Sequence, residues 1–132
     1  MGIEGIWNDN NEFSIPDDLH ALAKSRVGHL GRAYLTVEMA SASYEAMTEH
    51  SSFNDHRKVP FLITRAGAPG SHCFAAQTWS GDNYTSWHTL KHNIPMGLNA
   101  GLCLMSGYGH DIGGFAGPVP DAELLLRWIQ NG

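Results

Sequence analysis

The chain alternates between short runs that favour β-strands and longer segments that favour α-helices. The expected strands are 5–7, 59–64, 74–79 and 108–112, and the first of them is expected to be buried. Pro60 suits the start of the second run, because a proline at the first residue of a strand removes no central ladder hydrogen bond. Alternation of this kind is typical of β/α units that build a parallel sheet, so the predicted fold class is α/β.

Three helices are expected between and after these strands, at 31–49, 86–105 and 121–128. In the first, apolar residues recur at intervals of three and four, the spacing that gives a helix one buried face. These residues are Leu35, Met39, Ala42, Ala46 and Met47. Pro95 must start or kink the second helix, because proline lacks the N–H group that a helix interior requires.

The last helix has a recognisable start and stop. Asp121 can accept a hydrogen bond from the first free N–H groups, and Gly132 is of the type that ends helices. The apolar positions between them are Leu124, Leu125 and Ile129. The segment 13–30 contains Pro16 and scattered polar residues, and we expect a loop there with one helical turn.

Length and charge exclude several classes of protein. The 132 residues predict one domain, 1–132. A net charge of -5 with 8 Lys and Arg argues against nucleic acid or an anionic membrane as a partner. No segment approaches the roughly 20 apolar residues that span a bilayer, and no leader sequence is recognisable. Cys73 and Cys103 do not make a disulfide framework, so we expect a cytoplasmic location.

Two short motifs combine a carboxylate with a tryptophan just after an expected strand: G-I-W-N-D-N-N-E from Gly5 and W-S-G-D-N from Trp79. Cleavage of a glycosidic bond requires two carboxyl groups, one to protonate the leaving oxygen and one to attack or stabilise the sugar cation. Indole rings offer flat apolar faces to a sugar ring. The two motifs therefore indicate a glycoside hydrolase.

Five motifs in the same order strengthen this interpretation. They are G-I-W-N-D-N-N-E, L-I-T-R-A-G-x-P-G, A-A-Q-T-W-S-G-D-N, G-H-D-I-G-G-F and E-L-L-x-R-W-x-Q-x-G. Over 5–132 the chain resembles the catalytic barrel of glycoside hydrolase family 31. The resemblance implies a partial (β/α)8 TIM barrel of about four β/α units, similar to strands four to seven. It also implies a retaining α-glycosidase, most often an α-glucosidase, that acts on small oligosaccharides or α-glycosides through a covalent glycosyl-enzyme.

The resemblance assigns a role to each carboxylate. Asp9 matches the nucleophile, and Asn8, Asn10 and Asn11 could donate the hydrogen bonds that keep it ionised. Asp82 matches the general acid/base, which must carry a proton when the substrate binds. Local alternatives exist for both: Asp9 could belong to an asparagine-rich turn, and Asp82 could cap the helix that holds Trp87.

Further site residues follow from the same match. Arg65 is expected to contact the substrate and position the acid/base, since its planar fork holds geometry. Asp111 is expected near the sugar hydroxyls, and Glu12 is expected to orient its neighbours. Trp7, Trp79 and Phe115 are expected to pack against the sugar ring, although a tryptophan in a small domain is usually part of the core.

No metal or cofactor is expected. His88 and His92 have the spacing of a helical metal pair, but Thr89 stands where a metalloprotease has glutamate. His29, His50 and His56 lie in polar surroundings and are expected to be exposed.

The chain departs from the family pattern at two places. His72, Cys73 and Phe74 stand where relatives carry Gln-Arg-Tyr, and Tyr108 alone replaces a longer connection before Gly109. A second hypothesis is therefore a truncated, inactive barrel fragment with weak sugar binding or self-association. Half-barrels have unpaired strand edges, which favour pairing. A homodimer could rebuild eight strands, or the remainder of a barrel could supply them.

Overall fold

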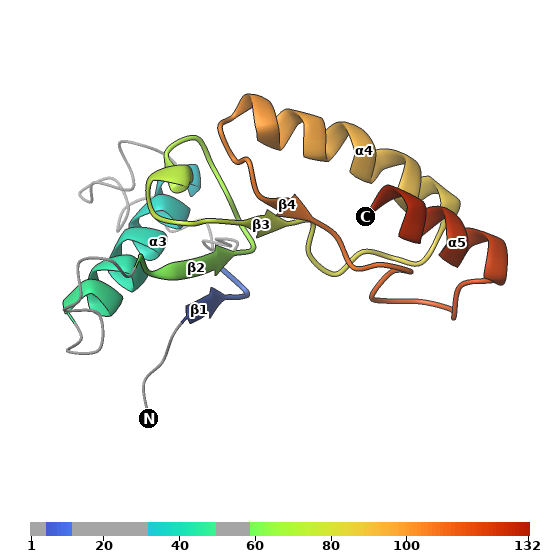
Figure 1. The fold of residues 1–132 in the computed structure, drawn as a ribbon, viewed down its shortest axis with the longest axis horizontal. Helices are drawn as coiled ribbons and strands as arrows, with labels where there is room; N and C mark the ends of the chain where they lie inside the picture. Colours follow the sequence, from blue (N-terminus) through green and yellow to red (C-terminus); the bar gives the residue numbers. More distant parts are fainter. Residues whose placement is uncertain (1–4, 12–31, 50–58) are drawn as a thin grey trace, which may run out of the picture.

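The computed structural model describes residues 5–11, 32–49 and 59–132 (Figure 1). The predicted loop at 13–30, Glu12 and the histidines at 29, 50 and 56 lie outside the described residues. In chain order the elements are β1 (Gly5–Asn8), α3 (Arg32–Glu49), β2 (Phe61–Thr64), the 3-10 helix η2 (Ser71–Cys73), β3 (Thr78–Trp79), α4 (Trp87–Leu102), β4 (Tyr108–Gly109) and α5 (Ala122–Asn131).

The strands lie side by side in chain order, and all of them are parallel. β1 pairs with β2, from Gly5 opposite Phe61 onward, and β3 pairs with β4. A bridge between Ile63 and Gln77 joins the two pairs, and the Thr64 N–H donates to the Gln77 carbonyl at 3.0 Å. The predicted alternation of parallel strands with helices is therefore confirmed.

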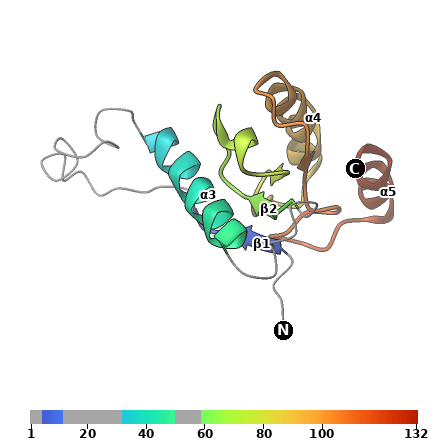
Figure 2. The same cartoon turned by 60° about the vertical axis from the view of Figure 1, so that its left-hand side comes forward.

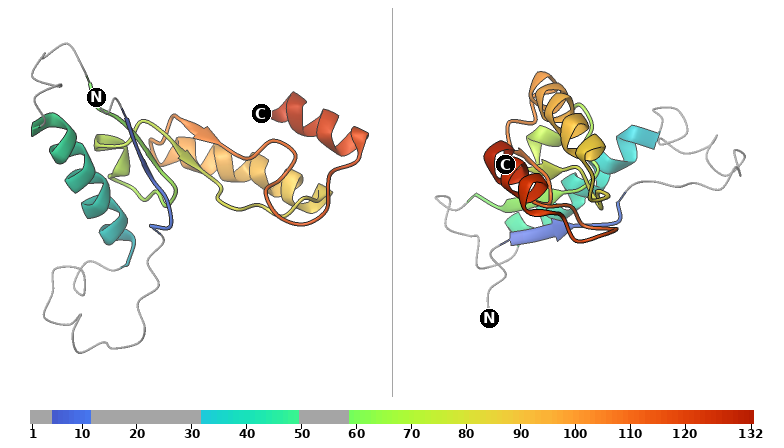
Figure 3. Two further views of the ribbon diagram at one scale, coloured as in Figure 1. Left: turned by 90° about the horizontal axis from the view of Figure 1, so that it is seen from below. Right: turned by 90° about the vertical axis from the view of Figure 1, so that its right-hand side faces the viewer.

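One face of this strand row packs against helices. α3 lies at the β1–β2 end of the row, while α4 and α5 lie at the β3–β4 end (Figures 2 and 3). Leu62 is fully buried in a cluster with Ala40 of α3, and Ile6 packs against the same cluster. At the other end, Gly97 of α4 lies so close to Tyr108 that a Cβ there would stand 2.9 Å from the ring.

The opposite face of the strand row carries the side chains that alternate with those facing the helices. We call it the open face, and its large side chains are Trp7, Phe61 and Trp79. Trp7 is 67% exposed and Phe61 is 49% exposed. The prediction that the first strand is buried is therefore wrong. The reason is that β1 pairs on one side alone within the described residues, and its large side chain points away from the helices.

Within the described residues, the core consists of two apolar clusters. The first lies between the strands and the helices and contains Ala40, Leu62, Ala75 and Met105. The second joins α4 to α5 through Leu90, Leu124 and the fully buried Trp128. The predicted cap of α5 is confirmed, because the Leu124 N–H donates to Asp121 Oδ1 at 2.7 Å.

Element boundaries differ from the sequence-based expectation at two helices and three strands. α4 ends at Leu102 and not at residue 105, and α5 continues to Asn131 and not to residue 128. The second strand begins at Phe61 and not at residue 59. The third begins at Thr78 and not at residue 74, because Ser71–Cys73 forms the 3-10 helix and Phe74 caps it. The fourth covers Tyr108–Gly109 alone. Pro95 lies inside α4, which Ser86 caps by accepting a hydrogen bond from the Thr89 N–H. Among the described helices, none has both the length and the apolar character that a membrane span requires.

Candidate active site

The polar residues singled out in the sequence gather at the carboxyl ends of the strands. Asp9 follows β1 directly, Arg65 follows β2 directly, Asp82 comes three residues after β3, and Asp111 comes two residues after β4. The carboxyl ends of parallel strands meet at one edge, where α/β proteins place their active sites. Short strands in register therefore bring together residues that are far apart in the chain.

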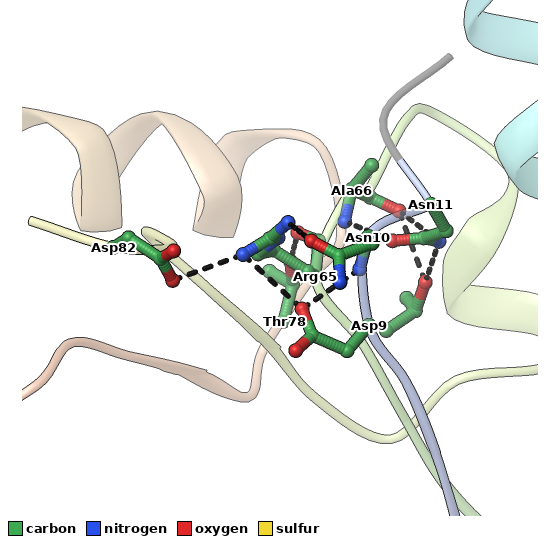
Figure 4. Close-up of polar contacts among 8 residues, drawn as sticks. Asp9, Asn10, Asn11, Arg65, Ala66, Thr78 and Asp82 are labelled. Carbon is green, nitrogen blue, oxygen red and sulfur yellow. Dashed lines mark hydrogen bonds and ion pairs between the residues drawn. The ribbon is translucent and has the colours of Figure 1, made fainter.

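Arg65 lies between two carboxylates (Figure 4). Its Nη1 is 3.1 Å from Asp9 Oδ1 and 3.0 Å from Asp82 Oδ1. The arginine side chain is 12% exposed, whereas the two acids are about half exposed. Because both oxygens contact the same nitrogen, they can be no more than about 6.1 Å apart. Two acids at this spacing could act together on one bond of a substrate.

Arg65 is held through its backbone on two sides and covered along its side chain on a third. Its N–H donates to the Asn8 carbonyl at 2.9 Å, and its carbonyl accepts from Thr78 Oγ1 at 2.8 Å. Gly81 has a φ of +76°, and a Cβ there would lie 3.2 Å from Arg65 Cδ. A glycine is therefore required where the loop that carries Asp82 passes over the arginine.

The three asparagines around Asp9 have separate roles. The Asn10 N–H donates to Asp9 Oδ1 at 2.8 Å, but Asn8 bonds to Ser43 of α3. Asn11 is buried, and its side chain bonds to Thr64. The prediction that all three supply donors to Asp9 is therefore wrong for Asn8 and Asn11. Asn8 is the last residue of β1, and side chains alternate along a strand, so its side chain lies on the face opposite Trp7, toward α3. Asn11 follows Asn10, whose positive φ turns the chain, and its side chain bonds to β2.

Sequence reasoning missed two contacts of these asparagines. The Asn10 side-chain oxygen accepts a hydrogen bond from Arg65 Nη2, and the Asn11 Oδ1 accepts one from the Ala66 N–H. The run of asparagines after a strand was the available signal. It could not tell which of them turn toward the arginine.

The alternative role for Asp82, as the cap of the helix that holds Trp87, is wrong. Ser86 occupies that position. Asp82 is instead 56% exposed in its side chain and ion-paired with Arg65. This exposure leaves it accessible to a substrate.

Asp111 lies within electrostatic reach of Asp82. Burial raises the pKa of the Asp111 carboxyl, the negative charge of Asp82 raises that pKa further, and His110 lowers it. The connection before Gly109 is short, yet β4 still pairs with β3 and brings Asp111 to the site. Within the described part of the chain, Arg65 is the cation in contact with Asp9 and Asp82.

His110 connects this edge to α5. Its Nδ1 accepts a hydrogen bond from Trp128 Nε1 at 2.9 Å, and its Nε2 lies 2.8 Å from the Asn131 Nδ2. Burial lowers the pKa of His110 from its ordinary value of 6.5, and the nearby Asp111 opposes this shift. Protonation of Nδ1 would also break the bond from the indole.

We expect the free energy of unfolding to decrease as the pH falls through and below about 6.5. The unfolded chain takes up a proton on His110 at a higher pH than the folded chain does, so acid favours unfolding. Thermal unfolding between pH 8 and 5 measures this dependence. His110→Gln should flatten it, whereas His72→Gln, a change at an exposed residue, should not. An unchanged slope in His110→Gln would contradict the assignment.

The three aromatic residues that were expected to pack against a sugar lie at two separate places. Trp7 and Trp79 pack edge to face with their ring centroids 5.3 Å apart. They form an apolar surface on the open face, next to Asp9. Phe115 is 66% exposed, and its N–H donates to the Asn83 carbonyl in the loop after Asp82. Contact of these rings with a sugar stays a prediction.

The histidine pair on α4 is engaged locally. The rings of His88 and His92 lie 4.1 Å apart, and His92 Nδ1 is 2.8 Å from the His88 carbonyl oxygen. Among described residues, no three His, Cys, Asp or Glu side chains form a group that could hold a metal.

The first of the two departures from the family pattern lies on η2 and directly after it. His72 and Cys73 are exposed, and Phe74 packs edge to face against Tyr44 of α3 at 6.0 Å. η2 itself packs against α3. The change in sequence at 72–74 is therefore accommodated on the helix-covered side of the strands.

Among the described parts of the chain, two cavities lie beside the strands. One, of about 390 Å³, is lined in part by Arg65, Trp79 and Ser80, and it adjoins the site. The other, of about 460 Å³, lies between α4, β4 and α5 and includes Asn93 and His110 in its lining. Neither lining includes Asp9 or Asp82, and the first cavity reaches the site through Arg65.

The chain is similar to known proteins over its whole length. Residues 1–132 match the family model described as "Glycosyl hydrolases family 31 TIM-barrel domain". Alpha-glucosidase 2 of Bacillus thermoamyloliquefaciens is 36% identical over 137 residues, which cover 100% of this chain and 17% of the relative. Glucosidase 2 subunit alpha of Saccharomyces cerevisiae is 40% identical over 135 residues, with coverage of 96% and 14%. The chain thus spans 14–17% of the length of these relatives.

Solved structures are also similar to this chain, in both sequence and fold. The cycloalternan-degrading enzyme of Trueperella pyogenes in complex with isomaltose superposes with a TM-score of 0.72 at 31% identity, covering 93% of this chain and 16% of that one. The Tris-bound glucosidase II alpha subunit gives a TM-score of 0.65 at 35% identity, with coverage of 76% and 10%.

Proposed function

The chain belongs to glycoside hydrolase family 31, and we propose that it carries the two reacting carboxylates of a retaining α-glycosidase. The single observation that carries this proposal is the Asp9–Arg65–Asp82 arrangement. It supplies two accessible acids at a fixed spacing, on the strand ends where a TIM barrel performs its chemistry. The spacing, no more than about 6.1 Å between the paired oxygens, is compatible with the roughly 5–5.5 Å of retaining enzymes.

In the first step a carboxylate oxygen of Asp9 attacks the anomeric carbon. The bond from that carbon to the leaving oxygen breaks, and the proton of Asp82 passes to the leaving oxygen. In the second step Asp82, now a carboxylate, takes a proton from water as the water oxygen attacks the anomeric carbon. The bond to Asp9 then breaks, and both acids return to their starting states.

Arg65 and Asp111 would hold the sugar. Arg65 contacts both acids, so a sugar hydroxyl near its guanidinium would be located relative to both. Asp111 lies close enough to Asp82 for their charges to interact, and it would accept hydrogen bonds from further hydroxyls. Trp7 and Trp79 would pack on the ring. The named activities of the relatives support an α-linked glucoside or short oligosaccharide as the substrate.

We further propose that the four strands correspond to strands four to seven of the family's barrel. The open face, with Trp7 and Phe61 exposed, would then be covered by further strands of a barrel or by a second copy of the chain. Sedimentation equilibrium across a range of concentrations distinguishes these cases. A dimer supports the second copy, and a monomer at all concentrations excludes it.

The experiment that tests the function is covalent labelling with 5-fluoro-α-glucosyl fluoride, followed by measurement of the intact mass. This reagent accumulates the glycosyl-enzyme because the second step is slow. An added glycosyl mass that maps to Asp9 supports the proposal. Absence of labelling, when a full-length relative reacts under the same conditions, would favour an inactive barrel fragment.

A further inference from the structure

The guanidinium of Arg65 has two ends with different partners. Nη1 contacts Asp9 and Asp82, and Nη2 donates to Asn10 Oδ1 at 2.5 Å (Figure 4). A guanidinium is planar and its nitrogens are fixed relative to one another. The direction of the Nη2 bond therefore sets where Nη1 lies.

Asn10 is itself fixed relative to the first acid. Its φ is +51°, in the left-handed region, and its N–H donates to Asp9 Oδ1 at 2.8 Å. One residue thus contacts Asp9 through its backbone and Arg65 through its side chain. Asparagine tolerates this backbone conformation better than most residues do.

The hydrogen bond at Nη2 also excludes a competing geometry. Arginine favours two-point pairing with a carboxylate, and the end-on form uses Nη1 and Nη2 together. With Nη2 bonded to Asn10, Arg65 contacts Asp9 and Asp82 through Nη1. The arginine is shared between the acids instead of locked onto one of them.

We propose that Asn10 is a positioning residue that keeps Arg65 between the two acids. This inference rests on the proposed function, in which Asp9 and Asp82 react in turn. Loss of the Asn10 oxygen would let Arg65 pair end-on with one carboxylate. Both steps of the reaction would then proceed from a displaced pair of acids, and a displacement of about 1 Å can cost about a hundredfold in rate.

Two substitutions separate the side-chain oxygen from the backbone. Asn10→Gly removes the oxygen and readily adopts a positive φ, while Asn10→Asp keeps an acceptor at the same position. A matched control is Gln130→Ala, because Gln130 Oε1 accepts from Arg127 Nη1 at 3.2 Å on the exposed face of α5. This substitution removes a hydrogen bond between an amide and an arginine, at a position far in sequence from Asp9 and Asp82.

The first measurement does not depend on activity. In the full chain labelled with 15N-arginine, Arg65 should show separate, slowly exchanging Nη signals, assigned by their loss in Arg65→Lys. Asn10→Asp should keep the Nη1 signal near its wild-type position, because Nη1 still lies between the two acids. Asn10→Gly should shift the Nη1 signal, because the guanidinium then turns to pair end-on with one carboxylate. Gln130→Ala should leave both signals unchanged. An unshifted Nη1 signal in Asn10→Gly would overturn the proposal.

The second measurement tests whether Asn10 acts through Arg65. Asn10→Gly should lower kcat/KM about ten- to a hundredfold on an α-glucoside with a poor leaving group, the range expected for a hydrogen bond to a charged group. Asn10→Asp should restore most of this loss. In an Arg65→Met background Asn10→Gly should have no further effect, and additive losses would overturn the proposal. A wild-type chain without labelling or turnover would refute the proposed function, while the 15N signals would still decide the position of Arg65.

Discussion

Asp9→Asn is expected to abolish covalent labelling and to lower kcat/KM by about 10⁴-fold or more. An amide is a poor nucleophile, and it removes the negative charge that stabilises the sugar cation. A loss of this size corresponds to about 5.5 kcal/mol of transition-state stabilisation. Turnover of an aryl α-glucoside and the intact mass after 5-fluoro-α-glucosyl fluoride treatment measure the two effects.

A matched control exists on α5. Asp121→Asn makes the same chemical change at the helix cap, where asparagine caps as well as aspartate does. It should label and turn over like the wild-type chain. A glycosyl mass that still maps to residue 9 in Asp9→Asn, or to another carboxylate in the wild-type chain, would refute the assignment of the nucleophile.

Asp82→Ala should produce a loss that depends on the leaving group. With an unactivated disaccharide, kcat/KM should fall about 10²–10⁴-fold, because the leaving oxygen is no longer protonated. With a glycosyl fluoride or a dinitrophenyl glycoside the first step needs little acid assistance. The glycosyl-enzyme should then accumulate, since the second step lacks its base, and the intact mass should show it during turnover.

The control for Asp82 is Glu123→Ala. Glu123 is an exposed acid that pairs with Arg127 at 3.7 Å, so the change removes an arginine-paired carboxylate outside the site. Its effect should be small and equal for all leaving groups. Equal losses on activated and unactivated substrates in Asp82→Ala would mean that Asp82 acts in some role other than acid and base.

The order of elements could be predicted from the sequence, because hydrophobic spacing and cap residues are local signals. Asp121, Leu124 and Gly132 mark the last helix, and it forms where expected. The length of the strands could not be predicted. Strand ends depend on pairing with neighbours, and Phe74, though apolar, packs against Tyr44 instead of joining β3.

The motifs name the residues of the candidate site, but they do not give the contacts between these residues. The motifs around Asp9, Arg65 and Asp82 identify the residues, and the structure brings these three together. No local rule shows that one guanidinium nitrogen contacts both acids, since this depends on the register of three strands. The same holds for Asn10, whose backbone and side chain act on different partners.

The order of strands along the chain also affects how the protein can fold during its synthesis. Each described strand pairs with the strand before or after it in sequence, so the sheet can grow as the polypeptide leaves the ribosome. Asp9 emerges 56 residues before Arg65, which takes roughly 3–11 s at about 5–20 residues per second. During that interval the proposed nucleophile exists without its arginine. The proposed pair of reacting acids is complete when the loop after β3 emerges, so a chain stalled before residue 82 carries one of the two carboxylates.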